Sequence, residues 1–134
     1  MAERRESGLL DTSVIIDLER ISADRLPWQS AVSAITMAEL VAGPAAAASG
    51  EERAIRQDRL QRAEATFDPI PFGIEAVRAY GRVHAAVLRV GRQPRRRFAD
   101  LLIASVALAE GLPLYTRNAD DFLGLDGLID VISV

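Results

Sequence analysis

The stretch "LLDTSVIIDL", residues 9–18, places a carboxylate between two apolar runs. An apolar pair leads into Asp11, the hydroxyl residues Thr12 and Ser13 follow, and a second apolar run begins at Val14. This pattern predicts a short buried strand that ends at Asp11, with Thr12 or Ser13 as the N-cap of the next helix. Asp11 should therefore project from the carboxyl end of a strand.

Similar apolar segments alternate with helical patterns along the rest of the chain. We expect strands in residues 30–36, 112–116 and 128–134, and a short β-like segment in residues 68–72. Strands that are apolar throughout and alternate with helices predict an α/β fold whose mostly parallel sheet is covered on both faces. The 134 residues fit a single domain. In such sheets, functional residues gather beyond the carboxyl ends of the strands.

Helices are expected between these strands. Thr36 should cap a helix over residues 37–43, and residues 45–67 should form a bent helical pair supported by an ion pair between Glu52 and Arg56. A mostly apolar helix should start at residue 98 and close at Gly111. A stripe at alternating spacings of three and four predicts another amphipathic helix, formed by Ile74, Val77, Gly81, His84 and Leu88. His84 is then a core or interface residue rather than a catalyst.

Composition limits the chemistry. The chain has no cysteine and one histidine, so a thiol nucleophile is excluded and a zinc site is disfavoured. All 16 basic residues are arginine, and the net charge is −3, which argues against a general nucleic-acid binder. The sequence shows no signal-like start and no apolar run long enough to cross a membrane, so we expect a soluble, cytoplasmic protein.

Acidic side chains recur at positions equivalent to that of Asp11. Glu39 lies one turn into the helix after the second strand, and Asp100 lies in the first turn of the helix after residue 97. Clustered carboxylates repel one another unless one of them takes up a proton or a cation. A hard divalent ion, Mg²⁺ or in its place Mn²⁺, resolves this repulsion and can activate water for phosphodiester hydrolysis.

We assign roles to these residues as follows. Asp11 and Asp100 are the primary metal ligands, and Glu39 is a ligand or orients the attacking water. Asn118, Asp120 and Asp121, just past the strand that ends at Thr116, compete for a fourth position. Hydroxyl groups that could hold the carboxylates by hydrogen bonds belong to Thr12, Ser13 and Thr116.

Four segments in this order resemble a known family: "LLDTSVIIDL", "ITMAELVAG", "FADLLIASVAL" and "LYTRNADDF". They are similar to the PIN-domain ribonucleases and, more narrowly, to the VapC toxins of bacterial toxin–antitoxin modules. The resemblance covers essentially the whole chain. It implies a three-layer α/β/α fold with a mostly parallel sheet of about five strands, Mg²⁺-dependent endoribonuclease activity on structured RNA such as tRNA or rRNA, homodimerisation, and inhibition by a cognate VapB antitoxin.

By the same resemblance, the family's acidic residues fall on Asp11, Glu39 and Asp100. The fourth acidic position often falls where this chain has Asn118, which puts a full second metal site in doubt. Asp121 compensates if its turn presents it inward. The other open reading is a PIN-like protein that processes RNA, or only binds it, without being a toxin.

Two further features concern binding. Arg95, Arg96 and Arg97 precede Asp100 and form either a phosphate clamp or a solvated face, and Arg117 is a weaker candidate for RNA binding. Trp28 either covers the core or anchors a partner.

Three other α/β modules fit poorly. A receiver domain needs a lysine, which the chain lacks, and a dinucleotide-binding domain needs a glycine-rich turn after the first strand. An adhesion module of the D-x-S-x-S type is disfavoured because Ile15 occupies the last position of that pattern.

Overall fold

A four-stranded parallel sheet organises the chain. The computed structural model describes residues 3–134, and over these residues the strands are β1 (Ser7–Leu10), β2 (Gln29–Ala31), β3 (Leu114–Thr116) and β4 (Val131–Ser133). Their order in the sheet is β2-β1-β3-β4, and every pair is parallel. The α/β class is confirmed. The expected fifth strand is reduced to a single parallel bridge between Ser33 and Ile70, within the segment predicted to be β-like.

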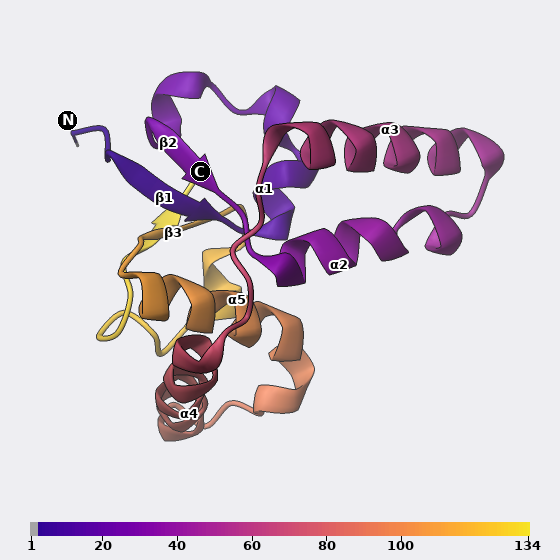
Figure 1. Cartoon of the computed structure of the whole chain (residues 1–134). Helices are drawn as coiled ribbons and strands as arrows, with labels where there is room; N and C mark the ends of the chain where they lie inside the picture. The colour runs from indigo at the N-terminus through magenta and orange to yellow at the C-terminus, as the bar shows by residue number, and fades with distance from the viewer. Residues whose placement is uncertain (1–2) are drawn as a thin grey trace.

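Helices cover both faces of this sheet. Successive residues of β1 point to opposite faces, so Leu9 and Leu10 belong to different apolar cores. The Leu9 core is covered by α4 (Ile74–Arg89) and α5 (Phe98–Glu110). The Leu10 core is covered by α1 (Thr12–Ile16), α2 (Ala34–Ala42) and α3 (Gly50–Thr66). In Figure 1, α2 and α3 run side by side and project from the body, and α4 lies against α5.

Short 3₁₀ segments complete the connections between these elements. They are η1 (Leu18–Arg20), η2 (Ala23–Arg25), η3 (Pro44–Ala46), η4 (Pro94–Arg97) and η5 (Ala119–Phe122). In the described part of the chain, no helix has the length and apolar character needed to cross a membrane.

Two predicted helix starts are wrong. The N-cap of α1 is Asp11 itself, and α2 begins at Ala34 with Ser33 as its N-cap. The Ser33 hydroxyl accepts a hydrogen bond from the Thr36 backbone N–H at 3.1 Å, which satisfies a donor at the open end of the helix. Residues 34–36 are therefore helical, and Thr36 lies inside α2 with its side chain fully buried.

Other local predictions are confirmed. Ser49 caps α3 by accepting from the Glu52 N–H, and Glu52 pairs with Arg56 at 2.5 Å within the helix. The first helix of the expected pair is wrong: before α3, only the 3₁₀ segment η3 is helical, and it ends at Ala46. Gly111 closes α5 in the left-handed conformation, with φ of 67°.

Helix α4 is amphipathic, but its predicted stripe faces solvent. Ile74, Val77 and Leu88 are 63%, 51% and 54% exposed. The buried face of α4 consists of different and smaller residues: Ala76, Ala79, Val83, Ala86 and Val87. The helix thus has two apolar faces on opposite sides, and only the alanine-rich face packs against the described core.

Candidate metal centre

Asp11 is a buried carboxylate in which one oxygen accepts hydrogen bonds and the other has no hydrogen-bond partner among the described residues. It lies at the carboxyl end of β1 and is 3% exposed. Its Oδ2 accepts from the Ser13 hydroxyl at 2.7 Å and from the Thr116 hydroxyl at 2.9 Å. Its Oδ1 is buried and has no hydrogen-bond partner among the described residues. A buried charged oxygen without a partner is costly, and a bound cation would remove that cost.

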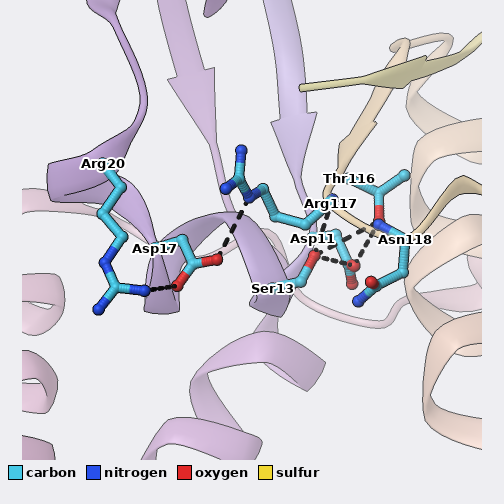
Figure 2. A network of polar contacts seen from close by, with 7 residues as sticks. All are labelled: Asp11, Ser13, Asp17, Arg20, Thr116, Arg117 and Asn118. Atoms are coloured by element: carbon cyan, nitrogen blue, oxygen red, sulfur yellow. Dashed lines mark hydrogen bonds and ion pairs between the residues drawn. The ribbon is translucent and has the colours of Figure 1, made fainter.

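The turn after β3 orients both hydroxyl groups toward Asp11. The backbone N–H of Arg117 donates to the Ser13 hydroxyl at 3.1 Å, and that of Asn118 donates to the Thr116 hydroxyl at 3.0 Å. Each hydroxyl oxygen already accepts one hydrogen bond, so its own proton is available for the carboxylate. Figure 2 shows these side chains gathered around Asp11. The structure therefore places Ser13 and Thr116 where they fix the direction of the Asp11 carboxyl group.

Thr12 holds the second acidic residue. Its hydroxyl donates to Glu39 Oε1 at 2.6 Å and lies 3.0 Å from the hydroxyl oxygen of Thr36. Glu39 is exposed on α2, and Thr12 begins α1, so this contact joins the two helices that follow β1 and β2. The prediction that Thr12 would hold a carboxylate therefore agrees with the geometry, and the carboxylate is that of Glu39.

Asp100 has a strongly raised pKa. Burial in the first turn of α5, followed by the negative charges of Asp11, Asp121 and Glu39, raises the pKa of Asp100 to about 7, against a smaller opposing effect of Arg97. The four acidic groups are therefore close enough to act on one another, although they are contributed by four separate elements. Near neutral pH, this arrangement favours either a proton on Asp100 or a nearby cation.

The three candidates for the fourth position are placed differently. Asp121 is the inward one: its side chain is 22% exposed and pairs with Arg97 at 3.0 Å. Asp120 and Asn118 are exposed, and Asn118 serves the site through its backbone N–H. The charge of Asp121 reaches Asp100, as expected if the turn compensates for the amide at Asn118.

The donor set suits a hard cation that retains water. Between residues 3 and 134, no three acidic or histidine side chains are gathered tightly enough to form a complete metal cage. Mg²⁺ does not need such a cage, because it commonly binds one or two carboxylates and keeps several water molecules. The Asp11 Oδ1, which has no hydrogen-bond partner among the described residues, and the carboxylate of Asp100 fit that requirement. Glu39 and Asp121 add negative charge beside them.

The four arginines predicted to bind RNA differ in where their side chains lie. Arg117 turns away from Asp11 and pairs with Asp17 at 3.2 Å, and Arg20 approaches the same carboxylate (Figure 2). Its side chain is thus engaged elsewhere, while its backbone supports Ser13. Arg95, Arg96 and Arg97 form the exposed 3₁₀ segment η4 directly before α5, with Arg97 turned to Asp121.

Two other sequence candidates lie outside this constellation. Trp28 is 65% exposed and does not cover the core; the guanidinium of Arg4 lies 3.7 Å from the centre of its ring. His84 packs its ring 5.7 Å from that of Tyr80 on α4.

Sequence reasoning missed Thr36, which contacts Thr12 from inside α2. A signal was available, because Thr36 precedes Glu39 by three residues and so lies on the same face of a helix. Its assignment as an N-cap concealed that relation.

Comparisons with known proteins agree with this geometry. The family model described as "PIN domain" matches residues 8–128. Ribonuclease VapC5 of Mycobacterium tuberculosis is 36% identical over 98% of this chain and 96% of its own length. VapC ribonuclease Y4jK of Sinorhizobium fredii is 36% identical over 88% of this chain and 93% of its own. The crystal structure of VapBC-5, a toxin–antitoxin system of M. tuberculosis, matches with a TM-score of 0.82 and 34% identity, covering 96% of this chain and 99% of that chain.

Asp100 should make the metal-free protein less stable as pH rises. Its folded pKa of about 7 exceeds the ordinary value of an aspartate in an unfolded chain, about 3.9. The folded state therefore binds this proton more tightly, so the contribution of Asp100 to stability is greatest below about pH 4 and is lost progressively as the pH rises through about 7. In EDTA, thermal unfolding of Asp100→Asn should fall less between pH 5 and pH 8 than that of the unsubstituted protein.

The exposed Asp126 provides a matched control, since Asp126→Asn removes a carboxylate away from this cluster. Parallel pH curves for Asp100→Asn and the unsubstituted protein would contradict the assigned pKa.

Proposed function

The chain belongs to the PIN-domain family of VapC ribonucleases, and on that premise we propose that it is a divalent-metal-dependent endoribonuclease. The observation that carries this proposal is the buried Asp11 carboxylate, whose Oδ1 lacks a hydrogen-bond partner among the described residues. The raised pKa of Asp100, about 7, supports it. An acid-rich site with this donor set suits Mg²⁺, with Mn²⁺ as a substitute.

The residues of the site have distinct tasks. When bound, a divalent cation supplies activation of water and neutralises charge on a phosphoryl group. Asp11 and Asp100 would hold that cation, and Ser13 and Thr116 fix the direction of the Asp11 carboxyl group. Glu39, anchored through one oxygen by Thr12, has its other oxygen available to accept a proton from the attacking water.

RNA binding must overcome the negative charge of the site. The exposed arginines of η4 lie immediately before Asp100 and offer planar donors for phosphate groups. Arg95 and Arg96 are the better candidates, because Arg97 already pairs with Asp121. We infer that they bind the backbone beside the scissile bond. The expected substrate is structured RNA such as tRNA or rRNA, cut in the cytoplasm at a single-stranded loop where the bases are accessible.

A groove beside the site suits an antitoxin segment, which would make the protein the toxin of a VapBC-type pair. Two adjoining hollows share Ile16, Ile55 and Arg59; one reaches Thr12 and Glu39, and the other reaches Phe67. Ile16 and Ile55 are 48% and 53% exposed. An amphipathic segment of a VapB-type protein could bury these apolar groups and approach the acidic residues from the groove.

The outer face of α4 supports a homodimer. Ile74 and Leu88 each lie two turns from Gly81 on the exposed apolar stripe, so the stripe is symmetric about that glycine. Two copies crossing antiparallel at Gly81 would bring Ile74 of each against Leu88 of the other, as an isologous interface requires. Light scattering should give the mass of two chains; a monomer at micromolar concentration would contradict this arrangement.

Cleavage should require both the cation and Asp11. The purified protein should cut RNA in Mg²⁺ and stop in EDTA. Asp11→Asn should lower the rate by at least about 100-fold, because loss of a group that merely supports a metal ligand already costs about 10- to 100-fold. Gel analysis of a labelled RNA provides the measurement, with Asp126→Asn as the control. Full activity of Asp11→Asn, or activity that survives EDTA, would refute the proposal.

The phosphate clamp predicts a loss of affinity that depends on salt. The double variant Arg95→Glu/Arg96→Glu should lose more RNA affinity, relative to the unsubstituted protein, at 50 mM salt than at 200 mM salt. The slope of log affinity against log salt concentration should become shallower by about 2. Arg25→Glu reverses an exposed arginine in η2 and serves as the control. An equal loss of affinity at both salt concentrations, measured by fluorescence anisotropy, would argue against phosphate contacts.

If the antitoxin binds in this groove, a substitution there should weaken inhibition without affecting RNA cleavage. Ile55→Asp should leave RNA cleavage intact and weaken inhibition by the cognate antitoxin by about tenfold or more, as expected for an apolar residue at the centre of an interface. Val41→Asp is the matched control, because Val41 is equally exposed on α2 and does not line the groove. Unchanged inhibition of Ile55→Asp would show that the antitoxin binds elsewhere.

A further inference from the structure

A chain of three hydroxyl groups leads to Glu39. Ser33 and Thr36 are fully buried, and Thr12 lies between them and the site. The hydroxyl oxygens of Ser33 and Thr36 are 3.5 Å apart, and those of Thr36 and Thr12 are 3.0 Å apart. Thr12 then donates to Glu39 Oε1 at 2.6 Å. Buried hydroxyls are tolerated when they bond to one another, so this chain accounts for two polar residues inside an otherwise apolar region.

The Thr12 hydroxyl is the donor toward both of its neighbours in this chain, Thr36 and Glu39. Each hydroxyl has a single proton. The proton of Thr12 goes to Glu39, because a bond to a carboxylate is stronger than one to a neutral hydroxyl. At the 3.0 Å contact the Thr36 oxygen lies as a second acceptor for the Thr12 hydroxyl, beside its bond to Glu39. The Ser33 oxygen accepts the Thr36 backbone N–H, which leaves its own proton for Thr36.

We propose that Thr36 is a positioning residue that acts on Glu39 through Thr12. Its hydroxyl oxygen, 3.0 Å from that of Thr12, fixes the Thr12 side chain where it donates to Glu39 Oε1, and so restrains an otherwise exposed glutamate. One carboxylate oxygen is then fixed and the other is left for water or a cation, the same division that Ser13 and Thr116 impose on Asp11. This inference rests on the proposed function, in which Glu39 takes part in RNA cleavage.

Thr36→Val isolates the hydroxyl. Valine has nearly the same shape, and it retains the backbone N–H that donates to Ser33, so the cap of α2 is preserved. We expect kcat for RNA cleavage to fall by about 10- to 100-fold. The RNA KM should change by less than about twofold, because Thr36 contacts no substrate. Thr36→Ser retains the hydroxyl and should restore most of the rate.

Ser105→Ala controls for the loss of a buried hydroxyl in general. Ser105 is also fully buried within a helix, and its hydroxyl donates to the Leu101 carbonyl oxygen at 2.7 Å rather than to an acidic side chain. This variant should cleave RNA at the normal rate. Thermal unfolding of both variants separates a general loss of stability from a specific effect on the site.

A double-mutant cycle tests the connection to Glu39. If Thr36 acts through that residue, Thr36→Val should cost nothing further in a Glu39→Gln background. Additive losses would overturn the inference. Should Thr36→Val fail to fold, Thr12→Val removes the same link from its other end and must show the same coupling.

Metal binding provides a readout that does not depend on cleavage. Titration calorimetry of the metal-free protein with Mn²⁺ should show weaker binding by Thr36→Val, by about tenfold, and normal binding by Ser105→Ala. If Thr36→Val binds Mn²⁺ and cleaves RNA normally, the inference fails and the proposed function stands. If the unsubstituted protein neither binds Mn²⁺ nor cleaves RNA, the proposed function fails as well.

Discussion

The burial of the Asp11 carboxylate is the constraint on which the rest of the site depends. A carboxyl group at 3% exposure is costly to bury unless its oxygens are hydrogen-bonded, and Ser13 and Thr116 bond only to Oδ2. Those two hydroxyls come from segments 103 residues apart in sequence, which adjoin because β1 and β3 are parallel neighbours. The sheet order thus creates a fixed carboxylate with one oxygen that lacks a hydrogen bond within the described chain.

The sequence allowed the acidic site to be predicted because strand ends and first helical turns have clear local patterns. Asp11, Asp100, Ser13 and Thr116 follow from such patterns, and so does the parallel sheet. Thr36 did not, because two hydroxyl residues competed for one cap and the backbone conformation of Ser33 decided between them. Likewise, the large residues of α4 suggested a core face, although the chain buries the alanines opposite so that α4 can approach α5.

Charge is arranged around the site in complementary layers. Burial and three acidic neighbours raise the pKa of Asp100, and Arg97, which pairs with Asp121, offsets part of that effect. Arg117, which precedes Asn118, pairs with Asp17 and therefore does not neutralise the acidic residues of the site. On the proposed account, a cation balances the inner layer and the exposed arginines of η4 meet the RNA backbone. The groove along α3 and the outer face of α4 lie on different helices, so partner binding and self-association need not compete.

The most direct test is a crystal structure of the protein in Mn²⁺, with anomalous diffraction used to locate the ion. The account predicts a peak within coordination distance of Asp11 Oδ1 and of the Asp100 carboxylate, with water completing the shell and Ser13 and Thr116 still bound to Oδ2. A map without a peak at saturating Mn²⁺, with these side chains in unchanged positions, would contradict the account.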